Sequence, residues 1–245
     1  MQNKPYILIS GATSDIGTSI SEVLCKDYPL LLHGRSKEKL EVLKENLKSI
    51  NSVDIWVADL SQIDSLKESL KDLMQTKQIQ ISGFVHCAGT IKILPLKDFD
   101  MNYIQEIYNV NLFSAIEILQ LLLKKSNLPY LNRIIFISAL YSKRGTKGNS
   151  IYASSKGAID SLVKSLALEL APNITVNSIL PGGIRTKMSE AVFNDPEKLA
   201  LLSAKYPLGF GQCKDIALMV QYLLGEGGRW ITAQNYCVDG GASMC

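Results

Sequence analysis

The sequence predicts one α/β domain, a doubly wound, mostly parallel sheet of seven strands with helices on both faces. Apolar runs of strand length alternate along the chain with longer segments whose apolar residues recur every three to four positions. Most of the short runs are nearly continuous Ile, Leu and Val, as strands buried on both faces require. No repeat or Pro/Gly-rich linker divides the 245 residues, so we predict a single domain over 1–245.

The elements follow in order along the chain. We expect strands at 6–10, 30–33, 53–57, 83–87, 133–138, 175–180 and 235–238. We expect helices at 16–26, 37–49, 63–77, 101–126, 151–170 and 215–224. In the second helix, for example, the apolar residues that share one face are Leu40, Leu43, Leu47 and Ile50.

Composition and charge exclude several classes of function. The net charge is +3 and the basic residues are scattered, which argues against a nucleic-acid surface. The longest apolar stretch, 116–123, is interrupted by Glu117 and Gln120 and is too short to span a membrane. The first strand follows Pro5 directly, so a signal peptide is not expected. The five cysteines are widely spaced without a CxxC pair, which predicts no metal site and fits a reducing cytoplasm.

A glycine motif follows the first predicted strand. Residues 10–17 read SGATSDIG, and a predicted helix begins at their end. A strand, a glycine turn and a helix N-terminus form a phosphate site, because main-chain N–H groups and the helix dipole favour negative charge. Two glycines at this spacing also occur in a plain strand–helix turn, so the motif needs context.

Three further motifs supply that context. Residues 86–89 read HCAG, residues 152–156 read YASSK, and residues 177–182 read NSILPG with Thr186 after them. Together with the glycine motif they resemble the short-chain dehydrogenase/reductase family over essentially the whole chain. The resemblance implies a Rossmann-type oxidoreductase that transfers a hydride between nicotinamide C4 and a carbonyl or alcohol carbon. The ending, WIT at 230–232 and VDGG at 238–241, resembles the 3-oxoacyl-(acyl-carrier-protein) reductase branch, although sugar and polyol dehydrogenases share it.

The end of the second strand bears on the choice of dinucleotide. Residues 33–36 read HGRS, so Gly34 stands where NAD binders usually place a carboxylate, and Arg35 follows. The planar guanidinium suits a 2′-phosphate, which predicts NADP(H) in preference to NAD(H). The alternative for Arg35 is a solvated residue before a helix, and Asp59 is equally compatible with a helix N-cap. Asp15 replaces a glycine of the family motif, and we expect it to face solvent.

The resemblance implies a set of cofactor-binding residues. These are Gly11, Thr13, Ser14, Ile16, Gly17, Arg35, Ser36, Asp59, Leu60, Cys87, Ala88, Gly89, Tyr152, Lys156, Pro181, Gly182, Ile184 and Thr186.

Tyr152 and Lys156 are the expected catalytic pair. They are four residues apart on a predicted helix and so share a face. A phenol has a pKa of about 10 in water, and a neighbouring ammonium would lower that pKa and bring it into range for proton transfer. The resemblance adds that Lys156 bonds the nicotinamide ribose and that Asn111 anchors a proton relay.

The family's serine is missing at its usual place. It lies 13 residues before the tyrosine, where this chain has Ala139. Ser138 is the nearest candidate and Ser142 a more distant one, but neighbours on a strand point to opposite faces unless a bulge intervenes. Losing such a donor typically costs on the order of 10²–10³ in rate. Three interpretations stay open: Ser138 shifts into the role, the enzyme is slow or uses another donor, or the alanine is an introduced or degenerative change. If the enzyme is slow, or if the alanine is an introduced or degenerative change, the alternative is a protein that binds a dinucleotide with little catalysis.

The segment 186–210 is expected to act as a lid over the crevice at the carboxyl ends of the strands. Its Met188, Val192, Phe193 and Leu199 are equally compatible with a substrate pocket and with the core face of the lid itself. The expected substrate is a small carbonyl compound or alcohol, including one bound to a carrier protein, with a sugar or polyol as the alternative. The resemblance also implies a homotetramer formed through the two long helices and the C-terminal strand, with no nucleic-acid or membrane partner.

Overall fold

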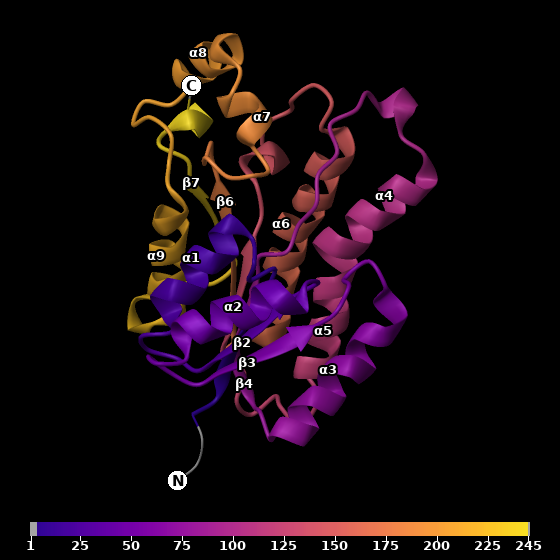
Figure 1. Ribbon diagram of the computed structural model, residues 1–245, viewed down its shortest axis with the longest axis vertical. Helices are drawn as coiled ribbons and strands as arrows, with labels where there is room; N and C mark the ends of the chain where they lie inside the picture. The colour runs from indigo at the N-terminus through magenta and orange to yellow at the C-terminus, as the bar shows by residue number, and fades with distance from the viewer. Residues whose placement is uncertain (1–3, 245) are drawn as a thin grey trace.

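The central sheet of the computed structural model, which describes residues 4–244, contains seven strands in the order β3-β2-β1-β4-β5-β6-β7 (Figure 1). Every neighbouring pair is parallel, which confirms the predicted fold class. The strands are β1 (Tyr6–Ser10), β2 (Leu30–Gly34), β3 (Val53–Val57), β4 (Ile81–His86), β5 (Arg133–Ile137), β6 (Thr175–Pro181) and β7 (Asn235–Val238).

The strand order reverses at β1, and this places the site. The chain runs outward from β1 through β2 to β3 and then crosses back to β4, which pairs with the other side of β1. A crevice opens at the carboxyl ends of the strands at such a switch point. The central strands are apolar because both of their faces are covered: Leu8, Leu31 and Phe84 are fully buried.

Two layers of helices cover the sheet (Figure 1). One core, on the face of α1, α2 and α9, contains Ile20, Leu40 and Val220. The other core, on the face of α3, α5 and α6, contains Leu66 and Val163. The long helices of these layers are α1 (Asp15–Leu24), α2 (Lys37–Leu47), α3 (Ile63–Lys77), α5 (Ser114–Leu122), α6 (Ser150–Leu170) and α9 (Cys213–Leu224).

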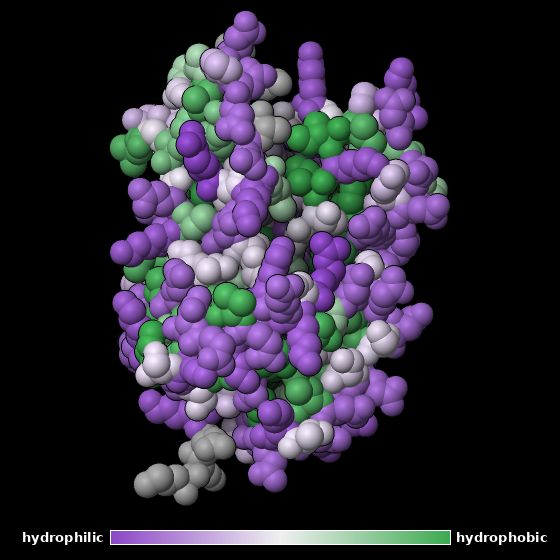
Figure 2. Space-filling model, in the orientation of Figure 1, coloured by the Kyte–Doolittle hydropathy of each residue, from purple (hydrophilic) through white to green (hydrophobic). Residues whose placement is uncertain are grey.

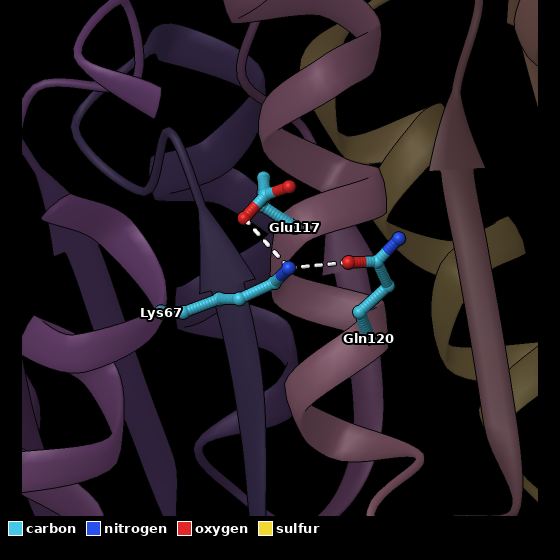
Figure 3. Close-up of polar contacts among 3 residues, drawn as sticks. All are labelled: Lys67, Glu117 and Gln120. Atoms are coloured by element: carbon cyan, nitrogen blue, oxygen red, sulfur yellow. Dashed lines mark hydrogen bonds and ion pairs between the residues drawn. The ribbon is translucent and has the colours of Figure 1, made fainter. Parts of the chain in front are cut away.

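Helices α3 and α5 pack side by side, and a polar contact joins their outer rim. The ammonium of Lys67 lies 3.0 Å from a carboxylate oxygen of Glu117 and also donates to Gln120 (Figure 3). This ion pair is partly exposed, so it contributes on the order of 1 kcal/mol or less. Buried residues beneath it, among them Leu70 and Leu119, carry most of the packing.

The long helix predicted at 101–126 is interrupted. It consists of α4 (Met101–Tyr108), a π-helical turn at Asn109–Phe113 and then α5. The apolar spacing continues through the turn, so periodicity does not reveal the wider winding. π-turns inside α-helices are frequent at functional sites, and this one contains the buried side chain of Asn111.

Between β6 and α9, two short helices form the segment 186–210. They are α7 (Glu190–Phe193) and α8 (Pro196–Ser203), at the upper end of the molecule in Figure 1. Within residues 4–244, none of the helices has the length and apolar character needed to cross a bilayer.

Candidate active site

The turn between β1 and α1 accepts only glycine at two positions. Gly11 has a φ of +68°, and a Cβ there would lie 2.7 Å from the Cα of Ala88. A Cβ on Gly17 would lie 2.2 Å from the carbonyl oxygen of Gly11. Ser14 caps the helix, since its hydroxyl accepts the N–H of Gly17 at 3.1 Å. The backbones of the turn, of α1 and of the β4 exit therefore approach one another closely.

His33, which the motifs did not single out, stabilises this turn. Its Nδ1 accepts the N–H of Gly11 at 3.2 Å, and its Nε2 donates to the carbonyl of Ala58 at 3.2 Å. Burial lowers the pKa of His33 to about 4, so the ring is neutral and can hold both contacts at neutral pH. The sequence signal was available, because a histidine in the otherwise apolar run LLLH calls for a buried partner.

A cleft of about 250 Å³ opens beside the turn. The ends of β1, β2, β3 and β4 line it, which is the place that the switch point predicts. Residues that the sequence did not single out for cofactor binding also line it: His33, Gly34 and Val110. The predicted cofactor residues in its walls are Gly11, Thr13, Ser14, Arg35, Asp59, Leu60, Cys87, Ala88 and Gly89.

The wall at the end of β2 disfavours a carboxylate. A Cβ on Gly34 would lie 3.2 and 3.3 Å from the side-chain atoms of Thr13, so a larger residue there would require the threonine side chain to shift by a few tenths of an ångström. Arg35 beside it is exposed on the rim of the cleft. Asp59 accepts the N–H of Ser61 at 3.0 Å in a local turn, and Gln62 occupies the N-cap of α3, so the N-cap alternative for Asp59 is wrong.

Other predicted cofactor residues lie outside the cleft walls. Ser36 caps α2 by accepting the N–H of Lys39 at 3.3 Å, and Ile16 packs with the core on the α1 face. Beyond β6, Gly182 donates its N–H to Val238, and Thr186 donates its N–H to the hydroxyl of Ser189. Pro181 ends β6, and Ile184 is buried beside Gly211. Their role in cofactor binding stays a prediction.

Asp15, which was expected to face solvent, is partly exposed and also bonded to a distant main-chain group. The side chain is half-buried, and its carboxylate accepts the N–H of Lys187 at 2.6 Å. The first turn of α1 is thereby joined to the start of the lid, a contact between residues 172 positions apart. This hydrogen bond is itself exposed, so the carboxylate keeps part of its contact with solvent.

Tyr152 and Lys156 lie in the first two turns of α6, and both side chains are buried. The Lys156 ammonium is 3% exposed, donates to the carbonyl of Ile137 at 2.9 Å, and lies 5.9 Å from the centre of the Tyr152 ring. Burial lowers the pKa of Lys156 to about 8. Burial also raises the pKa of Tyr152 above its usual 10.0, with smaller contributions from Tyr141 and Cys87. The expectation that the ammonium lowers the phenol's pKa is therefore wrong for the protein alone, because desolvation dominates.

Asn111 is fixed from several sides. Its amide accepts the N–H of Thr90 at 2.7 Å and donates to the Thr90 carbonyl at 3.1 Å and to the Ser155 hydroxyl at 2.9 Å. Ser155 lies on α6 between Tyr152 and Lys156, so the π-turn is tied to the catalytic helix. The predicted relay role of Asn111 remains a prediction.

A second buried histidine links the sheet to the π-turn. His86 contacts the Ser10 hydroxyl through Nδ1 at 2.8 Å and the Asn111 carbonyl through Nε2 at 3.2 Å. Burial lowers its pKa to about 3, so it is neutral. Three residues further on, a Cβ on Gly89 would lie 3.3 Å from the Lys156 ammonium, so Gly89 separates the cleft from the catalytic pair.

The serines near Ala139 are both engaged by α6. The Ser138 hydroxyl donates to the main-chain carbonyl of Lys156 at 3.3 Å. The Ser142 hydroxyl donates to the carbonyl of Ala139 at 2.8 Å and contacts the Asp160 carboxylate. These contacts do not support the predicted catalytic role of Ser138, because its hydroxyl is turned toward the helix backbone.

Aromatic rings of the segment 186–210 pack against one another. Phe193 lies 4.8 Å from Phe210, and Tyr206 lies 5.0 Å from Phe210, measured between ring centres. Met188 is exposed and Leu199 half-buried, while the side chain of Val192 lies outside the described set. These contacts support the alternative that Phe193 belongs to the core face of the segment 186–210 and not to a substrate pocket.

A family model described as enoyl-(acyl carrier protein) reductase matches residues 11–243. The chain belongs to the short-chain dehydrogenase/reductase family. This short-chain dehydrogenase/reductase is 31% identical to a tropinone reductase homolog of Arabidopsis thaliana, with 97% of this chain and 91% of the relative covered. It is 29% identical to a 3-oxoacyl-(acyl-carrier-protein) reductase FabG of Thermotoga maritima, with 96% of each covered.

Among solved structures, this short-chain dehydrogenase/reductase is similar to an NADP active-site complex of RhlG from Pseudomonas aeruginosa. The TM-score is 0.87 at 25% identity, and the match covers 98% of this chain and 96% of the other. Membership of the family makes the chain an oxidoreductase, and it resembles the 3-oxoacyl-(acyl-carrier-protein) reductase branch.

Proposed function

We propose that this oxidoreductase uses NADPH to reduce a carbonyl group to an alcohol, with a 3-oxoacyl thioester as the favoured substrate class. The observation that carries the proposal is the buried pair of Tyr152 and Lys156, which lies next to a cleft whose walls suit a dinucleotide. A dinucleotide crevice and a proton donor at the same edge of the sheet are what such a reduction needs.

The residues of the cleft fit the cofactor. Close backbone approach at Gly11 and Gly17 leaves room for a pyrophosphate at the N-terminus of α1. The crowding of Gly34 by Thr13 and the exposed guanidinium of Arg35 support NADP(H) over NAD(H), because a 2′-phosphate needs a cation and no carboxylate. The RhlG complex with NADP is consistent with this preference.

The mechanism follows from the protonation of the pair. When bound, the dinucleotide supplies the hydride that reaches the carbonyl carbon. Tyr152 is a phenol at neutral pH because its pKa lies above 10.0, and it donates its proton to the carbonyl oxygen as that oxygen gains charge. The Lys156 ammonium then stabilises the phenolate. Ser155 and Thr90 hold Asn111 beside Lys156, where Asn111 is placed to support the return of a proton.

The surroundings favour an apolar substrate chain. Figure 2 shows apolar side chains gathered near the upper ends of α4 and α6. Ile93 and Leu96, in the segment between β4 and α4, are exposed, and so is Met101, the first residue of α4. The main-chain N–H of Leu94 donates to the carbonyl of Gly148, which lies just before α6. Such a rim suits an acyl chain better than a polyol, which would need polar partners for each hydroxyl. The similarity to the Thermotoga maritima reductase supports the same substrate class.

The test is NADPH oxidation with three substrate classes: acetoacetyl-coenzyme A, simple ketones and keto sugars. We expect the highest kcat/KM with the thioester, and a loss of about 10²–10⁴-fold in Tyr152→Phe, the range expected for loss of an acid catalyst. NADPH binding, followed by fluorescence, should be retained in that variant. Tight NADPH binding without turnover on any of the three classes would refute the reductase. Preference for the keto sugars would instead favour the sugar or polyol alternative.

The engagement of Ser138 and Ser142 by α6 favours a second candidate, a protein that binds the dinucleotide with little catalysis. It predicts NADPH binding with no measurable turnover in the wild type or in Ala139→Ser. Turnover in the wild type would rule it out, because the chain would then possess its own donor.

We also propose a homotetramer formed through α5, α6 and β7. Strand β7 is an edge of the sheet, Trp230 just before it is 93% exposed, and Leu168 on α6 is 80% exposed. Apolar residues at an open strand edge favour burial against another copy. Light scattering should give four chains in each particle, and Trp230→Asp should lower that number. A wild-type monomer would refute the assembly.

A further inference from the structure

The site lacks an obvious donor for the substrate oxygen. Three hydroxyls lie in the five residues that follow β5, namely those of Ser138, Tyr141 and Ser142. The two serine hydroxyls are bonded to the Lys156 carbonyl and to Asp160. A reduction at Tyr152 still needs a second donor, because the carbonyl oxygen gains charge as the hydride arrives.

Tyr141 sits two residues beyond Ala139, in a short 3-10 turn at Leu140–Ser142. Its side chain is 38% exposed, and its hydroxyl has no hydrogen-bond partner among the side chains and main-chain groups that the structure describes. In a 3-10 turn successive side chains point about a third of a turn apart. Because Ser142 is directed at Asp160 on α6, Tyr141 is directed to a different side.

The turn itself lies at the carboxyl edge of the sheet, because it follows β5 directly. Tyr141 contributes to the raised pKa of both Tyr152 and Tyr206, so its phenol lies in the neighbourhood of both. Tyr206 stands at the exit of β6, where its hydroxyl would be 3.0 Å from a Cβ on Gly183. The Tyr141 phenol therefore lies near the catalytic tyrosine on α6 and near Tyr206, which follows α8.

We propose that the Tyr141 hydroxyl donates the hydrogen bond to the substrate oxygen that Ala139 cannot supply. The proposal rests on the proposed reductase function and names a further catalytic residue for it. A tyrosine ring carries its hydroxyl much further from the backbone than a serine does, which compensates for the offset of two positions. The hydroxyl exchanges a solvent partner for the substrate oxygen, and no covalent bond changes.

Asp160 positions the turn that carries Tyr141. It is buried, contacts the hydroxyl of Ser142 and accepts a hydrogen bond from the hydroxyl of Ser178 at 2.9 Å. The turn after β5 is thereby fixed to α6 and β6 at once. Fixing the backbone on both sides of Tyr141 holds its ring near the pocket and lowers the entropy lost when substrate binds.

The experiment compares Tyr141→Phe, Ala139→Ser and the double variant, with acetoacetyl-coenzyme A and NADPH as probes. Tyr141→Phe should lower kcat by on the order of 10²-fold and leave the Kd for NADPH unchanged. Ala139→Ser alone should raise kcat by less than about threefold, because a donor is already present. Ala139→Ser in the Tyr141→Phe background should restore most of the lost rate, a non-additivity that two independent sites would not give.

Tyr130→Phe is the matched control, since Tyr130 is 43% exposed on the loop before β5, and it should match the wild type. Equal kcat in Tyr141→Phe and the wild type overturns the inference while the proposed function stands. A large gain from Ala139→Ser in the wild-type background also overturns it. Absence of turnover in the wild type with all three substrate classes refutes the proposed function, and the inference with it.

Discussion

Burial of the Lys156 ammonium should make the folded protein less stable at neutral pH than at alkaline pH. The pKa of this group falls from its usual 10.5 to about 8 on folding. Between these values the unfolded chain binds more protons than the folded one, so the free energy of unfolding rises with pH in this window. The direction is opposite to that of a lysine that gains an ion-pair partner on folding.

The magnitude follows from the pKa shift. At about pH 7 a shift from 10.5 to about 8 costs the folded state about 3 kcal/mol, at about 1.4 kcal/mol for each pH unit. At about pH 9.5 the remaining cost is about 1 kcal/mol, because the folded-state amine is then mostly neutral. The wild type should therefore gain about 2 kcal/mol across this interval from Lys156 alone.

Lys156→Met isolates this contribution, because methionine fills similar space without titrating. Urea unfolding at about pH 7 and about pH 9.5 gives the free energy of unfolding of each protein. The wild-type minus variant difference should rise by about 2 kcal/mol, while the titration of other groups largely cancels. A difference that stays constant or falls with pH would show that the ammonium is solvated in the folded protein, and would refute the reasoning.

Three further predictions concern the cofactor cleft. Arg35→Ala should weaken NADPH binding by about 10- to 100-fold and leave NADH binding unchanged. Lys37→Ala is the control and should leave the Kd values for both dinucleotides unchanged. An equal loss of affinity for NADPH and NADH in Arg35→Ala would count against a contact with the 2′-phosphate. Gly11→Ala should abolish NADPH binding, measured by titration, because the new Cβ would lie 2.7 Å from Ala88. His33→Phe should lower the free energy of unfolding by about 1–3 kcal/mol, because the Gly11 N–H and the Ala58 carbonyl lose their partner; an unchanged urea midpoint would contradict this.

The sequence predicted the fold well because the signals for it are local. Continuous apolar runs mark parallel strands, and the helix at 63–77 begins and ends where its spacing does. The glycine turn was equally clear, since Gly11 has positive φ and Gly17 lies under a carbonyl, and each condition restricts one position to glycine. The position of the cleft was predictable because a doubly wound sheet opens a crevice at the carboxyl ends of its strands.

What the sequence did not predict depends on partners distant in the chain. Asp15 bonds Lys187 across 172 positions, and the direction of Ser138 depends on the carbonyl of Lys156 on the next helix. The π-turn at Asn109–Phe113 keeps its apolar faces, so a spacing of three to four residues does not reveal it. The raised pKa of Tyr152 was missed because desolvation depends on the whole packed site, while an i,i+4 spacing indicates only the nearby ammonium.

The burial of Lys156, which lowers the free energy of unfolding at neutral pH, also affects whether the site favours reduction or oxidation. At about pH 7 Lys156, with a pKa of about 8, is mostly an ammonium, and Tyr152 is a phenol. The buried pair therefore already holds the proton that a reduced carbonyl oxygen requires. Oxidation of an alcohol would first require Tyr152 to lose its proton against the effect of desolvation, which the lysine alone does not overcome. Under the proposed function, we therefore expect reduction to be fast at neutral pH and the rate of oxidation to increase as pH rises.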